Sequence, residues 1–161
     1  MLYKSLKQLM CISTFLFFIA LPEVKSQAVE KKSSAEGWIG LSCGFTGQAS
    51  LEVKRIAELL VTKQYTTLVE LINTGTPAAQ SLAVMACEVL VKQRELSLPP
   101  SVRDKIVFLY QSNQHVNVCS GCVLNSSLAI GKLLMQTSRL SFGRTLRNYF
   151  QNIYEKSTSK I

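Results

Sequence analysis

The residues of this chain best suited to chemistry are two cysteines in the sequence Cys119-Ser120-Gly121-Cys122. They lie in a polar stretch, residues 111–125, between two segments with a helical pattern. A Cys-x-x-Cys pair is either a local disulfide or a redox pair. A thioredoxin-like redox cysteine opens a helix after a central strand, and no sheet is predicted before this motif. We therefore expect a structural disulfide between Cys119 and Cys122, with redox activity as the alternative.

Two more cysteines lie outside the leading segment of the chain, Cys43 and Cys87. Four cysteines allow two disulfides, and their spacing alone does not decide the connectivity. Cys87 stands among apolar residues, which favours a buried thiol, and pairing with Cys43 is the open alternative. A Cys119–Cys122 bond closes a very short loop and constrains the unfolded chain little. We therefore expect Cys119→Ser plus Cys122→Ser to leave a folded helical protein.

Metal and haem sites are poorly supported by the sequence. Zinc needs four ligands, or three and a water, and the candidates are His115, Cys119, Cys122 and Cys43. The leading segment, described below, predicts export, and thiols of exported proteins tend to oxidise, so this set is not expected to bind metal. Attachment of c-type haem requires histidine directly after the second cysteine, where this chain has Val123. We expect no metal and no cofactor.

Hydrolytic chemistry is equally poorly supported. A Ser-His-Asp site would need His115 with Asp104, the sole aspartate, and no Gly-x-Ser-x-Gly motif is present. The pattern at Ser101–Asp104 favours a helix cap as the role of Asp104. Four glutamates have the spacing of solvated helix faces: Glu52, Glu58, Glu70 and Glu88. We expect no catalytic residues.

The first residues have the order of a secretory signal. Lys4 and Lys7 precede an apolar run over residues 9–21, and Ser26-Gln27-Ala28 offers small residues for cleavage. The alternative, a membrane anchor, is disfavoured because a span needs about 20 apolar residues. We expect a signal peptide over residues 1–28, a mature chain that starts near Val29, and a secreted or periplasmic protein.

The mature chain would have 133 residues and a formal charge of +6, enough length for one domain with its own core. Most of the excess charge lies after residue 123, with six basic residues and one acid. The last helix could therefore contact an acidic surface, although a solvated face accounts for the same pattern. Its aromatic and basic residues lie on opposite faces, and together with export this argues against nucleic acid.

Helical patterns cover most of the mature chain. Residues 29–50 are expected to be irregular, residues 51–156 to form a helical domain and residues 157–161 a flexible tail. Thr76-Pro77 starts a helix, with threonine as the cap and proline at the first position. The next helix is apolar all round, so we expect Leu82, Met85, Ala86 and Val89 at the centre of the core. The fold class is all-α, with about five to six helices.

Residues 65–90 resemble one HEAT-like helical repeat: a first helix ends in Leu68-Val69-Glu70-Leu71-Ile72, and an alanine-rich helix follows Thr76-Pro77. Residues 101–134 could be a second helix pair, opened by the segment with the cysteines. The chain also resembles small secreted bacterial proteins of unassigned function that carry a Val-Cys-Ser-Gly-Cys loop, matched here by residues 118–122. The first resemblance implies a short HEAT-like stack, to which an irregular bundle of the same helices is the alternative. The second resemblance implies no activity.

Stacked helix pairs leave an extended surface that suits protein binding. The sequence therefore predicts an exported, non-catalytic helical interaction module with a protein partner. The alternative is a thiol-redox or thiol-regulated protein that uses the pair Cys119 and Cys122.

Overall fold

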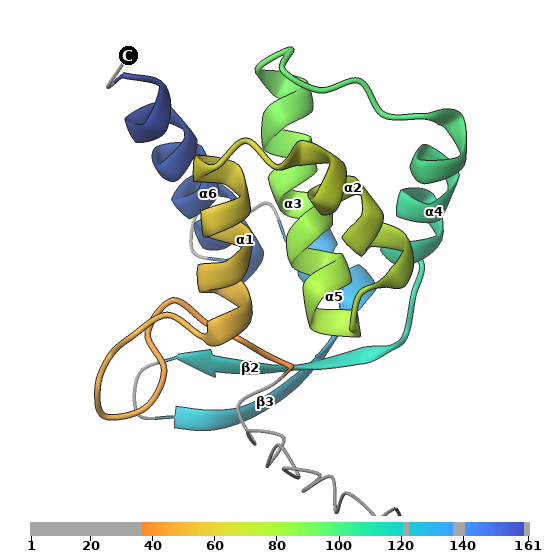
Figure 1. Ribbon diagram of the computed structural model, residues 1–161. Coiled ribbons are helices and arrows are strands. Elements are labelled where there is room, and N and C mark those ends of the chain that lie inside the picture. The colour runs from red at the N-terminus through yellow and green to blue at the C-terminus, as the bar shows by residue number, and fades with distance from the viewer. Residues whose placement is uncertain (1–36, 121–122, 137–140, 160–161) are drawn as a thin grey trace, which may run out of the picture. The chain divides into compact units, whose positions relative to one another are not determined.

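The protein is mainly helical, but it also contains a small sheet (Figure 1). The computed structural model describes residues 37–159 except 121–122 and 137–140. The expected signal peptide lies outside these residues, and so does Cys122. Six helices and three strands are present in the described part. The expectation of an all-α fold is therefore confirmed only as far as the helices, and the sheet corrects it.

Helix α3 (Pro77–Lys92) lies at the centre of the fold because it is apolar on nearly every side. Its start follows the sequence prediction: Thr76 Oγ1 accepts a hydrogen bond from the Ala79 amide at 3.3 Å, and Pro77 takes the first helical position. Every residue from Ala78 to Cys87 is buried. The predicted core centre at Leu82, Met85, Ala86 and Val89 is confirmed, since none of the four is more than 6% exposed.

Helix α4 packs mainly against α2 and α5, whereas the other four helices pack closely against α3. Helix α2 lies along it, α1 and α6 lie on one side, and α4 lies on the other side (Figure 1). Each of them has an apolar stripe that faces the common core. Their bounds are α1 Leu51–Val61, α2 Tyr65–Thr74, α4 Pro100–Tyr110, α5 Ile130–Met135 and α6 Phe142–Thr158.

The sheet contains the strands β1 (Trp38–Ile39), β2 (His115–Ser120) and β3 (Val123–Ala129), in that order. Strand β1 pairs with β2 in parallel, and β2 pairs with β3 in antiparallel orientation. Val116 and Val118 on β2 point into the core, so the sheet closes one end of the helical bundle. Its β2–β3 hairpin occupies the stretch that the sequence predicted as a polar loop.

Three element boundaries differ from the sequence prediction. Strand β3 extends to Ala129, inside the second helix pair predicted over residues 101–134, so α5 begins only at Ile130. Helix α4 begins at Pro100, which leaves the expected capping box at Ser101 inside the helix. Helix α6 continues through Thr158, two residues into the expected tail.

A search for membrane-spanning segments covered only the described residues, and none of the helices there is both long and apolar enough to span a bilayer.

Candidate functional site

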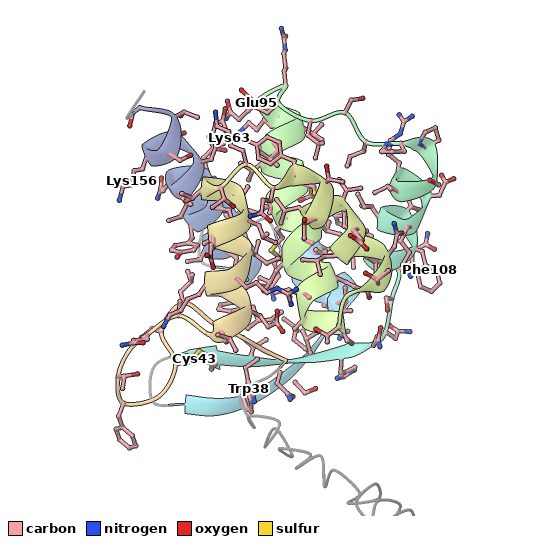
Figure 2. All side chains as sticks on the ribbon, viewed as in Figure 1. Trp38, Cys43, Lys63, Glu95, Phe108 and Lys156 are labelled. Atoms are coloured by element: carbon pink, nitrogen blue, oxygen red, sulfur yellow. A yellow bond between two sulfur atoms is a disulfide. The ribbon has the colours of Figure 1, made fainter. Side chains whose placement is uncertain are left out.

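A disulfide joins Cys43 to Cys119, 76 residues apart in the sequence, with their Cα atoms 5.3 Å apart (Cys43 is labelled in Figure 2). The expected pairing of Cys119 with Cys122 is therefore not the one found, and Cys122 itself lies outside the described residues. The alternative pairing of Cys43 with Cys87 is not found either, because Cys87 is a free thiol. The physical reason is that the parallel pairing of β1 with β2 brings the segment before α1 against Cys119.

An irregularity in β2 turns Cys119 toward this segment. The register of the β2–β3 ladder shifts between Val118 and Cys119, so both residues are buried although they are neighbours on one strand. Gly40 leaves the space that the bond requires. A Cβ atom at Gly40 would overlap both sulfur atoms and the Cys119 carbonyl, so only glycine fits there.

The disulfide holds a compact loop, residues 40–50, onto the sheet. Gly40 and Ser50 close its base: the Ser50 amide donates to the Gly40 carbonyl at 2.8 Å, and Ser50 Oγ accepts from the Gly40 amide at 3.2 Å. Further out, the Cys43 amide donates to the Gln48 carbonyl at 2.8 Å. Gly44 and Gly47 take positive φ angles of 64° and 61°, which lets the chain turn back between them.

Cys87 lies in the core and does not belong to this site. Its side chain is fully buried on α3, and burial, with a smaller effect of the neighbouring Glu88 carboxylate, raises the pKa of the thiol to about 12. A thiol with so high a pKa has almost no thiolate at neutral pH and is chemically inert. The prediction that Cys87 is a buried small hydrophobe is confirmed.

A second polar cluster, which we call the Glu88 hub, consists of Glu88 on α3, Tyr110 on α4 and Arg147 on α6. Arg147 Nε lies 2.9 Å from Glu88 Oε2, and its Nη2 donates to the Tyr110 hydroxyl at 3.1 Å. The Tyr110 hydroxyl donates in turn to Glu88 Oε1. Arg147 also donates to the carbonyl of Leu134 at 2.7 Å, at the end of α5. The hub thus joins four helices through one guanidinium group.

The sequence prediction missed the hub. The spacing of Glu88 predicts a solvated face, and Arg147 is one of the basic residues predicted opposite the aromatic face of the last helix. In the structure their side chains are only 30% and 19% exposed. Glu52 was also expected in solvent, yet it is 7% exposed at the start of α1. The pairing partner of Glu88 lies 59 residues along the chain, so no local spacing could indicate it.

The Tyr110 hydroxyl is strongly affected by its surroundings. Burial, followed by the hydrogen bond to Glu88 and its charge, raises the pKa of Tyr110 to about 12, although Arg147 acts in the opposite direction. The neutral phenol is therefore the form that the folded protein stabilises.

We expect Tyr110→Phe to lower the free energy of unfolding at pH 7 by about 1–2 kcal/mol, because the Glu88 carboxylate loses a donor. The pKa is raised on folding, so the contribution of Tyr110 is fully present below about pH 10 and is lost as the pH rises to about 12. Wild type should thus lose more stability than Tyr110→Phe over this window. Urea unfolding at several pH values measures this. Cys87 titrates in both proteins, so it cancels in the comparison. If the unfolding free energies of the two proteins changed in parallel between pH 10 and pH 12, the role given to the Tyr110 hydroxyl would be contradicted.

Two surface hollows flank the Glu88 hub. One lies between α3 and α6, has a volume of about 340 Å³, and is lined mainly by polar and basic residues: Glu88, Val89, Lys92, Gln136, Arg144, Arg147, Asn148 and Gln151. We call it the basic hollow. The other lies between α3 and α4, has a volume of about 410 Å³, and has an apolar floor: Val91, Leu98, Ile106 and Val107, with Glu88, Lys92 and Arg103 at its rim. We call it the apolar hollow.

The two hollows share Glu88 and Lys92, so they form one continuous face of the protein. Among the described residues that line the two hollows, Glu88 is the only carboxylate, and the contact with Arg147 neutralises it. Among the described residues, neither Lys92 nor Arg103 forms an ion pair. The face is therefore apolar on the α4 side and carries an excess of positive charge.

The other predicted site residues are not brought together. His115 lies on the exposed side of β2, where its Nδ1 is 2.9 Å from Ser127 Oγ. Cys43 and Cys119 are bonded to each other and so offer no thiolate to a metal. Within the described ranges, no three side chains of His, Cys, Asp or Glu are grouped closely enough to hold a metal ion. Comparison with protein-family models, with curated proteins and with solved structures finds no match to this chain.

Proposed function

We propose that the protein is an exported, non-catalytic helical interaction module. Its partner is a protein that places an amphipathic, acidic segment on the face formed by the two hollows. The observation that supports this most directly is the apolar hollow. Its rim carries the cations Lys92 and Arg103, and the one carboxylate among its described lining residues is already neutralised. An apolar side chain of the partner would fill the hollow, and its acidic residues would meet the rim.

Exposed apolar side chains on the same face support the proposal. Val91 and Val107 line the apolar hollow and are 42% and 57% exposed. Large apolar residues grouped in this way mark binding surfaces more often than isolated ones do.

Export and the helical-repeat character belong to the same proposal. A Cys43–Cys119 disulfide is compatible with an oxidising compartment outside the cytoplasm. The segment that resembles a HEAT-like repeat comprises α2 and α3, and α3 supplies one wall of both hollows. In such stacks the helix faces left exposed are the ones that bind protein.

Site-specific photo-crosslinking in the native host tests the proposed partner surface. A photoreactive amino acid at Val107 is expected to give a discrete adduct with one partner protein, and Arg103→Glu in the same chain should abolish it. Val61 provides the matched control, because it is a valine of similar exposure, 51%, on α1 outside both hollows. If Val107 gives no adduct, or if Val61 gives the same one, the proposal fails.

A thiol-regulated function is the second candidate, and one observation favours it. Cys119 is bonded to Cys43 but lies only three positions from Cys122 in the sequence. Attack of a Cys122 thiolate on Cys119 Sγ would form a Cys119–Cys122 bond and release Cys43 as the thiolate, with no net oxidation. The reduction potential of the protein separates the two roles. A value below about −300 mV indicates a structural disulfide, and one between about −230 and −120 mV indicates a redox role.

A further inference from the structure

The loop over residues 40–50 carries the most exposed large apolar side chain of the described residues. Phe45 is 99% exposed at its tip, between Gly44 and Gly47. The loop is nevertheless well held: the disulfide ties it to β2, and the hydrogen bond between Cys43 and Gln48 closes it below the tip. Because the backbone of the tip is already held, binding through Phe45 would cost little ordering of the loop.

The start of α1 adds a second apolar side chain and two cations beside this loop. Leu51, Lys54 and Arg55 are three and four positions apart, so they lie on one face of the helix, and all three are exposed. Leu51 directly follows the base of the loop. The Lys54 ammonium donates to Gln48 Oε1 of the loop at 2.8 Å, which places one positive charge against the loop itself.

The charged residue next along this face is Glu58, which is exposed on α1. It lies about 10 Å along the helix axis from Leu51, on the side away from the loop. Glu52, one position after Leu51, is buried. The exposed charges closest to the loop along α1 are therefore both positive.

We propose that this loop and the first turns of α1 form a contact site for an anionic membrane surface. Phe45 and Leu51 enter the interface, and Lys54 and Arg55 lie at the level of the lipid phosphates. A convex tip flanked by cations suits a lipid surface better than a protein partner, which would need a matching pocket. The site lies apart from the two hollows and does not depend on the function proposed for them.

Vesicle sedimentation with the full mature protein tests this. Wild type is expected to bind vesicles of phosphatidylcholine mixed with phosphatidylglycerol, and not vesicles of phosphatidylcholine alone. Phe45→Ser should weaken binding about tenfold, the effect of removing one apolar side chain from the interface. Phe108→Ser is the matched control and should bind as wild type, since Phe108 lies on α4. Because Phe45 is fully exposed, its replacement should leave the far-ultraviolet circular dichroism and Tm unchanged.

Two double substitutions that remove the same charge at different places test the contribution of the cations to vesicle binding. Lys54→Gln plus Arg55→Gln should weaken binding more than tenfold, because each cation near an anionic surface contributes about fivefold. Lys92→Gln plus Arg103→Gln removes the same net charge from the rim of the apolar hollow and should have little effect on vesicle binding. The second double variant should instead impair crosslinking at Val107, so failures of the two proposals can be told apart.

Insertion of the tip is measured with Phe45→Trp. The added indole should show a blue-shifted emission with the mixed vesicles and quenching by lipids that carry a quencher in the acyl chain, beyond the signal of Trp38 in wild type. The proposal is overturned by the absence of binding to the mixed vesicles, by equal loss from Phe45→Ser and Phe108→Ser, or by the absence of an emission shift for Phe45→Trp. If the two double variants weakened vesicle binding equally, the membrane contact would depend only on net charge, and the proposal would likewise be overturned.

Discussion

Replacing Cys43 and Cys119 together by serine is expected to lower the free energy of unfolding by about 4 kcal/mol. The bond encloses a loop with a sequence separation of 76 residues. The entropy that such a crosslink removes from the unfolded chain corresponds to roughly 4–5 kcal/mol, within the usual range for native disulfides. Since single domains are stable by about 5–15 kcal/mol, this variant should be close to unfolding at physiological temperature.

Urea unfolding of the oxidised protein measures the effect, and Cys122→Ser is the control. That variant retains the Cys43–Cys119 bond, so its unfolding midpoint should stay close to that of wild type. A reducing agent should destabilise wild type as much as the double substitution does, and it should not destabilise the double variant further. A loss below about 1 kcal/mol would contradict this, as would a peptide map that joins Cys119 to Cys122.

This expectation reverses the one drawn from the sequence. A Cys119–Cys122 bond would have made Cys119→Ser plus Cys122→Ser a mild change. In the structure that variant also removes the bond to Cys43, so it should be as destabilised as Cys43→Ser plus Cys119→Ser. Spacing along the chain identified the cysteines but could not identify the partner, because the partner is set by the pairing of β1 with β2.

Local signals account for the parts of the fold that the sequence predicted. Thr76 and Pro77 determine the start of α3 through contacts within one turn, and the apolar pattern of Leu82 to Val89 predicts its burial without knowledge of any neighbour. These features depend on residues close together in the chain. A single sequence therefore suffices to predict them.

The sheet and the Glu88 hub depend on residues far apart in the chain. In β2 only Val116 and Val118 show the alternation of a half-buried strand, and the apolar residues at the two ends of β3 are separated by the polar run Asn125 to Ser127. Its partner β1 has two residues and lies nearly 80 positions earlier, at a register that pairs Ile39 with Val118. The sequence shows no pattern that links such segments, and the same holds for Glu88 and Arg147.

Phe150→Ala is expected to lower the free energy of unfolding by about 3–5 kcal/mol, because it removes an aromatic ring from a fully buried position. Phe150 lies on α6 in the main core, and its ring centroid is 5.7 Å from that of Tyr149 in an edge-to-face arrangement. The surrounding helices can close only part of the cavity that the ring would leave. The loss should appear in urea unfolding as a lower midpoint with an unchanged slope.

The chain offers the same substitution at two exposed positions. Phe108→Ala removes a ring that is 61% exposed and has the Lys105 ammonium 5.0 Å from its centroid, so its cost should stay below about 1 kcal/mol. Phe45→Ala removes one that is 99% exposed and should cost about 0.5 kcal/mol or less. The expected loss of unfolding free energy therefore decreases from Phe150 to Phe108 to Phe45. Because the substitution is the same at all three positions, the difference reflects burial alone. A cost at Phe150 no greater than that at Phe108 would mean that α6 does not pack into the core as the structure places it. In that case the Glu88 hub, which depends on Arg147 of the same helix, would also have to be abandoned.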